Sequence, residues 1–190
     1  MERAQGRGFL GPGPVNEHLE HAKGFLAAVD APSRALDLGS GAGIPGLALA
    51  LTWAASTWVL LDAGARRAAH LEEAVADLDL GSRVTVVRER AEVAAREDGL
   101  RAAFDLVVAR SFGPAAVTAE CASGFLCVGG RLIVSEPPED VADRWASPGL
   151  ASLGLADRGR RGAVRVLEQV EPLSERYPRR VGIPMKRPLW

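Results

Sequence analysis

Short apolar runs and helically spaced apolar residues alternate along this chain. Each of five runs is bounded by polar or turn residues, which predicts buried strands at 34–38, 57–61, 83–87, 104–109 and 131–135. Between them the apolar spacing predicts helices at 46–54, 65–79, 91–97 and 114–126. Because strands that alternate with helices are typical of parallel sheets, we expect a parallel sheet with helices on both faces.

The two ends of the chain depart from this alternation. Residues 1–13 are rich in Gly, Pro and Arg, which predicts an irregular arm, and helical spacing from Val15 predicts an amphipathic helix that stops at Pro32. Near the other end, strands are predicted at 153–158 and 164–170, and the Gly- and Arg-rich loop between them suits a hairpin. The expected fold is therefore α/β, with a mostly parallel seven-stranded sheet and an antiparallel edge.

The length of the chain limits its organisation. With 190 residues it fits one α/β domain, which we place at 34–190, preceded by an arm and helix at 1–33. No room is left for a separate substrate domain, which counts against an ordinary two-domain dehydrogenase.

The stretch Leu36–Gly46 has four glycines within eight residues, between a predicted strand and a predicted helix. Such a turn lets backbone approach a nucleotide while helix N–H groups point at it. Two registers overlap. Gly41–Gly46 matches the G-x-G-x-x-G of dinucleotide folds, with Asp62 near the usual acidic position. From Asp37 the stretch has the acid-x-Gly-x-Gly-x-Gly pattern of S-adenosylmethionine sites, in which Asp37 accepts hydrogen bonds from the amino end of the ligand.

Residues at the ends of the other strands favour the second register. Asp62 is suited to hold two ribose hydroxyls, and a backbone N–H and carboxylate of Arg90–Glu92 could contact an adenine edge. Arg110 follows the fourth strand. Each residue also has an ordinary interpretation: a helix cap for Asp62, a solvated helix residue for Glu92 and a surface ion pair for Arg110. Together they favour an adenosine-type ligand.

Composition and cysteine usage are those of a cytoplasmic protein. The net charge is −1, although arginine far outnumbers lysine. Cys121 and Cys127 have no C-x-x-C spacing, and the apolar pattern predicts that both lie in a helical stretch, so we expect reduced thiols. The N-terminus has no signal-peptide core. No charge occurs between Asp37 and Asp62, but a buried helix followed by a buried strand explains that run better than a membrane span.

His18 and His21 are three residues apart and share one face of the predicted N-terminal helix. No further ligand completes a metal site, so we expect solvated histidines and no bound metal.

Several of these segments together carry a family resemblance. Asp37–Gly46, Leu61–Asp62, Arg90–Glu92, Ala109–Phe112 and the tail Tyr177–Leu189 resemble the RsmG (GidB) family. That resemblance implies a Rossmann-like class I fold and a monomeric enzyme that transfers methyl from S-adenosylmethionine to a guanine N7 of 16S ribosomal RNA.

The resemblance also implies site residues. Cofactor contacts are implied at Gly39, Ile44, Ala91, Glu92 and Arg110. With the residues argued from the motif, the full cofactor set is Asp37, Gly39, Gly41, Gly43, Ile44, Asp62, Ala91, Glu92 and Arg110. Arg110 is also the catalytic candidate, holding the cofactor or neutralising the electron-rich edge of the target. Candidate RNA contacts in the basic C-terminal part are Arg179, Arg180, Lys186 and Arg187.

The chain departs from the family in two places. Its first 34 residues are shorter than the family's helical N-terminus, and Ser135-Glu136-Pro137 stands where the family has Lys-Gly. An acidic Glu136 near an RNA-facing edge is expected to oppose phosphate binding. A methyltransferase of another substrate, or a non-catalytic nucleotide-binding module, therefore stays open at this point.

Overall fold

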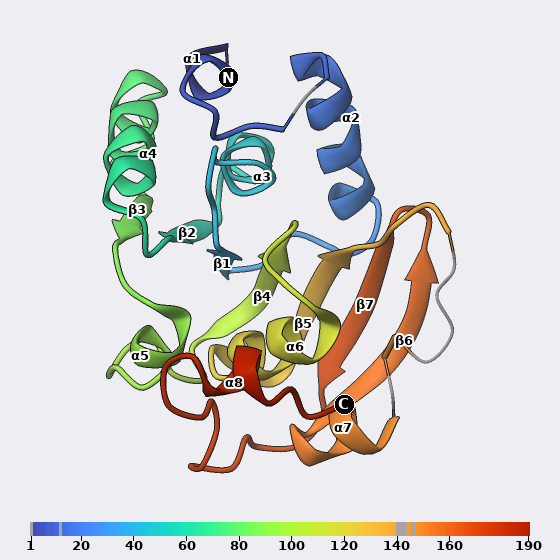
Figure 1. Ribbon diagram of the computed structural model, residues 1–190. Helices are drawn as coiled ribbons and strands as arrows, with labels where there is room; N and C mark the ends of the chain where they lie inside the picture. Colours follow the sequence, from blue (N-terminus) through green and yellow to red (C-terminus); the bar gives the residue numbers. More distant parts are fainter. Residues whose placement is uncertain (1, 12, 140–143, 146) are drawn as a thin grey trace.

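The computed structural model describes residues 2–11, 13–139, 144–145 and 147–190. It contains a seven-stranded sheet with the strand order β3-β2-β1-β4-β5-β7-β6 (Figure 1). The strands are β1 Arg34–Leu38, β2 Thr57–Leu61, β3 Val84–Val87, β4 Phe104–Ala109, β5 Leu126–Ser135, β6 Leu155–Arg161 and β7 Val164–Gln169. Strands β1 to β5 pair in parallel, and β7 pairs antiparallel with both β5 and β6. The expected parallel sheet with an antiparallel edge is confirmed.

Helices cover both faces of this sheet (Figure 1). They are α1 Glu2–Gly6, α2 Val15–Leu26, α3 Gly46–Thr52, α4 Ala65–Asp77, α5 Ala91–Ala94, α6 Ala115–Ser123, α7 Ser147–Ser152 and α8 Ile183–Lys186. Sequence periodicity predicted α2 to α6, whereas α1, α7 and α8 are too short to show it. No helix among the described residues is long and apolar enough to cross a membrane.

Side chains of each central strand alternate between two apolar layers. Leu36 and Leu38 of β1 belong to a cluster with α5, α6 and the C-terminal segment, whereas Ala35 joins α2, α3 and α4 on the opposite face. Phe25 of α2 has no exposed surface and is part of that second cluster. Helix α2 is therefore packed onto the sheet, and the domain boundary at residue 33 stays a prediction.

Strand β5 begins five residues before its predicted start. The pairing with β4 shifts register between Phe104 and Leu106, and this irregularity takes up the Gly129–Gly130 segment. Cys127 consequently lies in β5, and the prediction that places it in a helix is wrong. Both cysteines are free.

Candidate functional site

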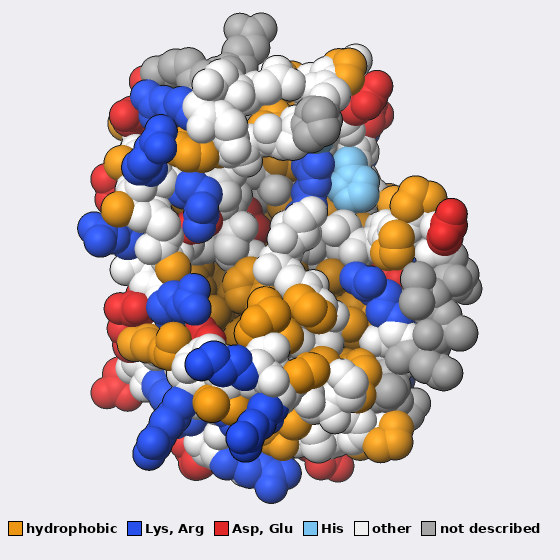
Figure 2. Space-filling model, in the orientation of Figure 1, with side chains coloured by type: hydrophobic (Ala, Val, Ile, Leu, Met, Phe, Trp, Pro, Cys, Tyr) orange, Lys and Arg blue, Asp and Glu red, His pale blue; other side chains and the backbone are white. Residues whose placement is uncertain are grey.

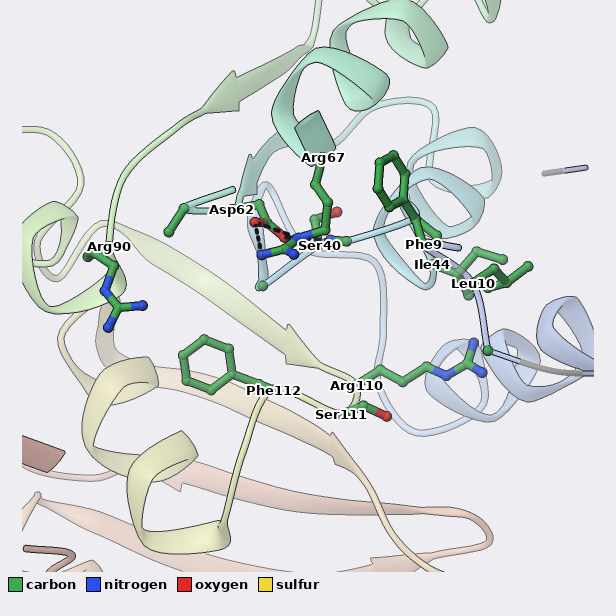
Figure 3. A pocket seen from close by; sticks show the side chains of 15 residues that line it. Phe9, Leu10, Ser40, Ile44, Asp62, Arg67, Arg90, Arg110, Ser111 and Phe112 are labelled. Atoms are coloured by element: carbon green, nitrogen blue, oxygen red, sulfur yellow. Dashed lines mark hydrogen bonds and ion pairs between the residues drawn. The ribbon is translucent and has the colours of Figure 1, made fainter. Parts of the chain in front are cut away.

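A large cavity lies at the carboxyl ends of β1, β2 and β4 (Figure 3). Its volume is about 510 Å³. This is the switch point of the sheet, where β2 and β4 flank β1 on opposite sides, and open α/β sheets bind ligands at such points. The wall is formed by Phe9, Leu10, Gly11, Gly39, Ser40, Gly41, Ala42, Ile44, Asp62, Ala63, Arg67, Arg90, Arg110, Ser111 and Phe112.

The glycine-rich loop has a shape that side chains would prevent. Gly39 has φ +70°, and a Cβ there would lie 2.6 Å from Cδ2 of Phe112. A Cβ on Gly43 would lie 2.3 Å from a methyl carbon of Leu47. Gly39 and Gly41 line the cavity, whereas Gly43 packs behind it against the helix. The loop thus presents bare backbone to the cavity.

Asp37 supports this loop from behind. Its side chain is 1% exposed, and Oδ2 accepts hydrogen bonds from the Ser40 hydroxyl at 2.7 Å and the Gly46 N–H at 3.0 Å. Burial raises the pKa of Asp37 to about 6, although these two hydrogen bonds oppose the shift. The residue is absent from the cavity wall. We therefore assign Asp37 a role in positioning the loop, and the ligand contact that the motif suggests stays a prediction.

Asp62, in contrast, faces the cavity with both oxygens engaged. Oδ2 accepts the Gly41 N–H at 3.0 Å and Oδ1 accepts the Gly64 N–H at 2.8 Å. Arg67 of α4 adds a salt bridge at 2.8 Å and donates Nε to both oxygens (Figure 3). The carboxylate is 4% exposed, while the Arg67 side chain is 46% exposed. Arg67 therefore occupies the acceptors that ribose hydroxyls would use, and it can swing into solvent.

A smaller hollow of about 180 Å³ continues from this cavity past Phe112. Its wall is largely apolar and includes Ala91 and Cys121. Glu92 also lines it, and its Oε1 accepts the backbone N–H of Gly182 at 2.9 Å. Met185 of α8 completes the wall. The C-terminal segment thus closes the hollow, which the strand-end pattern did not predict.

Arg110 is held between the sheet and the N-terminal segment. Its Nη2 lies 2.5 Å from Nδ1 of His18, and Nε2 of His18 lies 3.2 Å from the Gly11 carbonyl oxygen. Because arginine only donates hydrogen bonds, Nδ1 of His18 is the acceptor in the first contact. Nε2 then carries the imidazole proton and donates a hydrogen bond to the Gly11 carbonyl oxygen. Nη1 of Arg110 is buried and has no hydrogen-bond partner among the described residues. One donor of Arg110 therefore remains for a ligand.

Two expectations about charged and polar side chains are corrected by the structure. His18 is only 8% exposed, so it is not a solvated helix-face residue. Glu136 is buried, where it accepts a hydrogen bond from Trp145 Nε1 at 2.8 Å and pairs with Arg144 at 3.3 Å. Its charge is compensated within the protein, which reduces the repulsion of RNA phosphates that the sequence predicts. The described residues contain no cluster of metal ligands.

The four C-terminal basic candidates separate into two kinds. Arg179 forms a salt bridge at 2.6 Å with Glu120, which has no exposed surface, so we assign Arg179 to the fold. The remaining three are exposed, and we call them the C-terminal basic group: Arg180, Lys186 and Arg187. Lys and Arg side chains gather over α8 and the segment around it (Figure 2).

Several wall residues were not predicted from the sequence. Phe9, Leu10 and Gly11 come from the arm after α1 and cover one end of the cavity. Their apolar character within a Gly- and Pro-rich arm was the only available signal. Arg67 follows Asp62 by five residues on the first turn of α4, and that spacing could have suggested the pair.

Comparisons with known proteins agree with this geometry. A family profile described as "rRNA small subunit methyltransferase G" (GidB) matches residues 15–137. Among curated relatives, "Ribosomal RNA small subunit methyltransferase G" of Thermotoga sp. (strain RQ2) is 37% identical over 164 residues, covering 81% of this chain and 71% of the relative. The protein of the same name from Roseiflexus castenholzii (strain DSM 13941 / HLO8) is 36% identical, with 92% and 79% covered.

Solved structures with a similar fold include a methyltransferase. "Crystal Structure Analysis of LaPhzM" superposes with a TM-score of 0.62 at 16% identity, covering 80% of this chain and 54% of that one, so this chain spans about half its length. A geranyl diphosphate methyltransferase "in complex with SAM" gives 0.57 at 13% identity, with 78% and 73% covered. These likenesses establish the class I methyltransferase fold. With the family match over residues 15–137, they show that this chain belongs to the GidB family, the rRNA small subunit methyltransferase G proteins.

Proposed function

We propose that this protein methylates N7 of an unpaired guanine in small-subunit (16S) ribosomal RNA, with S-adenosylmethionine as methyl donor. The observation that carries the proposal is a glycine-lined cavity at the switch point of a GidB-family chain, bounded by Asp62 and by an arginine with one buried donor free. Its volume of about 510 Å³ lies within the range of cofactor sites.

The residues fit this cofactor. Asp62 would accept the two ribose hydroxyls once Arg67 moves aside, and the bare backbone of Gly39 and Gly41 admits the ligand closely. The apolar hollow beside Ala91 suits the adenine ring, with Glu92 at its edge. Ile44 lines the large cavity, so both ends of the cofactor have candidate contacts.

Nη1 of Arg110 would bind the carboxylate end of the cofactor, since a guanidinium is a strong donor to carboxylates. His18 holds the other side of the same guanidinium and so fixes its direction. Arg110 acts in this proposal by orienting the methyl donor.

The reaction needs little acid–base chemistry from the protein. Bound S-adenosylmethionine supplies a methyl group on a positively charged sulfur. Guanine N7 has a free lone pair on the Hoogsteen edge, so no general base has to remove a proton and no metal is required. The protein has to align the two reactants, and orientation alone can contribute up to about 7–11 kcal/mol. The base must be unpaired or flipped out to reach the site.

RNA would lie across the C-terminal basic group, whose exposed charges are free to bind phosphates. The free cysteines agree with a reducing compartment, and we propose that the enzyme works as a monomer in the cytoplasm.

The test is transfer of tritium from labelled S-adenosylmethionine to isolated 30S subunits, naked 16S RNA and a metabolite extract. We expect label in the ribosomal RNA, with strand cleavage by borohydride and aniline at one labelled guanine. Asp62→Ala should abolish transfer and weaken cofactor binding in calorimetry, whereas Asp30→Ala, at an exposed site, should change neither. Label confined to the extract would overturn the RNA assignment, and tighter binding of NAD than of S-adenosylmethionine would overturn the cofactor assignment.

A further inference from the structure

A second cavity lies at the carboxyl ends of β4 and β5, next to α2. Its volume is about 360 Å³, and Arg110, Ser111 and Phe112 line it as well as the cofactor cavity. We call it the β4–β5 cavity. Its other wall residues are His21, Gly113, Thr118, Val134, Ser135, Glu136, Pro137 and Arg144. Because the two cavities share a wall, a ligand in one lies directly beside a ligand in the other.

Three buried nitrogen atoms of residues at this cavity have no hydrogen-bond partner among the described residues. Nε of Arg144 is one of them, but it forms an ion pair with Glu136 at 3.3 Å. The other two are Nη1 of Arg110 and Nε2 of His21, which have no such pair. Buried polar atoms in native proteins nearly always have a partner, so these two atoms are available to bind a ligand or a water molecule in the cavity. Arg110 borders both cavities, but His21 lines the β4–β5 cavity and is absent from the cofactor cavity. The unpartnered Nε2 of His21 is therefore available to a ligand in the β4–β5 cavity and not to one in the cofactor cavity.

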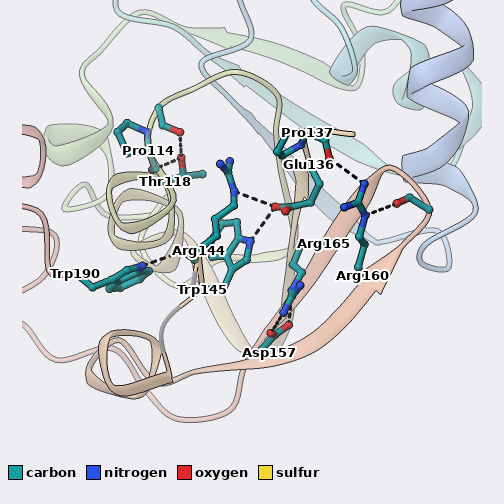
Figure 4. A network of polar contacts seen from close by, with 12 residues as sticks. Pro114, Thr118, Glu136, Pro137, Arg144, Trp145, Asp157, Arg160, Arg165 and Trp190 are labelled. Carbon is teal, nitrogen blue, oxygen red and sulfur yellow. Dashed lines mark hydrogen bonds and ion pairs between the residues drawn. The ribbon is translucent and has the colours of Figure 1, made fainter. Parts of the chain in front are cut away.

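The opposite wall carries little net charge. Glu136 is compensated by Arg144 and by the Trp145 indole, which both point toward its carboxylate (Figure 4). His21 is uncharged at neutral pH because burial, followed by the nearby Arg110 and His18, lowers its pKa. A neutral imidazole offers one N–H donor. Apart from Arg110, which also borders the cofactor cavity, the wall therefore suits a polar but uncharged group with an acceptor atom, such as a nucleobase.

We propose that the β4–β5 cavity holds the methyl-accepting guanine and that His21 donates its Nε2–H to guanine O6. O6 and N7 are neighbouring acceptors on the Hoogsteen edge. A donor on O6 fixes the rotation of the base while it leaves the N7 lone pair free for the methyl group. Phe112 and Ser111, at the shared wall, mark where N7 would meet the cofactor cavity. This inference rests on the function proposed above.

The test combines a change in the protein with a change in the base. Wild-type enzyme and His21→Ala are given RNA with guanine or with 2-aminopurine at the target position, because 2-aminopurine keeps N7 and lacks O6. A single hydrogen bond corresponds to roughly threefold to tenfold in kcat/KM. We expect the kcat/KM of the wild-type enzyme to fall by that factor when 2-aminopurine replaces guanine. For His21→Ala we expect the same fall already on guanine, and no further fall on 2-aminopurine.

Controls separate contact from structural damage. His21→Gln keeps an N–H donor and should restore discrimination between the two bases, while the Kd for S-adenosylmethionine stays within about twofold in both variants. Lys23→Ala, on the same helix at a position with a 66% exposed side chain, should behave as wild type. Undiminished discrimination in His21→Ala would overturn the inference and leave the proposed function standing. If wild-type enzyme labels no RNA at all, both are overturned.

Discussion

Replacing Asp37 with asparagine tests whether a buried charge supports the glycine-rich loop. Oδ2 accepts both hydrogen bonds, from Ser40 and from Gly46, so an amide oxygen at the same place can keep them. The substitution removes only the charge and adds an amide group of nearly equal size. Because burial dominates the raised pKa of Asp37, we expect the charged form to destabilise the fold.

The size of this effect follows from the shift in pKa. The pKa of Asp37 rises from 3.8 to about 6. Since each unit of pKa shift corresponds to about 1.4 kcal/mol, the ionised carboxylate lowers the free energy of unfolding by about 3 kcal/mol. Between these two pH values the folded protein retains a proton that the unfolded chain has lost. Stability of the wild type therefore falls as pH rises through that window, and the Asp37→Asn variant lacks this fall.

The assay is urea unfolding of both proteins from about pH 4.5 to about pH 7.5, where roughly 2 kcal/mol of the difference should develop. Any constant contribution from the added amide cancels, because only the change of the difference with pH is used. Asp30→Asn, at an exposed position, should give a curve parallel to that of the wild type. Parallel curves for Asp37→Asn as well would show that position 37 carries no buried charge.

Three further predictions concern the ion pairs and the RNA surface. Arg179→Ala leaves the buried Glu120 unpaired and should destabilise the protein by about 3–5 kcal/mol in urea unfolding, while the exposed Arg180→Ala stays near wild type; equal stability of the two would refute the structural role. Arg67→Ala frees the Asp62 carboxylate and should tighten S-adenosylmethionine binding by roughly threefold to tenfold in calorimetry. Weaker binding would contradict the idea that Arg67 and the ribose hydroxyls compete for Asp62. Alanine at all three positions of the C-terminal basic group should weaken RNA binding and reduce the salt slope by about 2, whereas an unchanged slope would place the RNA elsewhere.

The sequence predicted the central strands well because their burial is continuous. Three strands, Arg34–Leu38, Thr57–Leu61 and Phe104–Ala109, have the expected bounds, since each is a run of apolar residues buried on both faces of the sheet. The start of β5 was missed because a register shift in the pairing with β4 depends on the partner strand, which local sequence does not encode.

The sequence predicts a residue of the site most directly where that residue comes immediately after a strand. Asp62 and Arg110 line the cavity because parallel strands end at the same edge of the sheet. Residue type alone predicts ligand roles for Asp37 and Arg179. Sequence spacing does not show that Asp37 is buried or that Arg179 pairs with the buried Glu120, 59 residues away. Phe9 and His18 reach the site through packing of the N-terminal segment, and no spacing rule predicts such contacts.

The bond from Gly182 to Glu92 links parts of the chain that are made at different times. Ninety residues separate these two positions, and Met185 completes the same apolar wall. During synthesis, strands β1 to β3 can emerge and pair long before that wall exists. The wall of the hollow beside Ala91 is therefore completed only after residue 185 has left the ribosome, when the strands of the sheet have already been made.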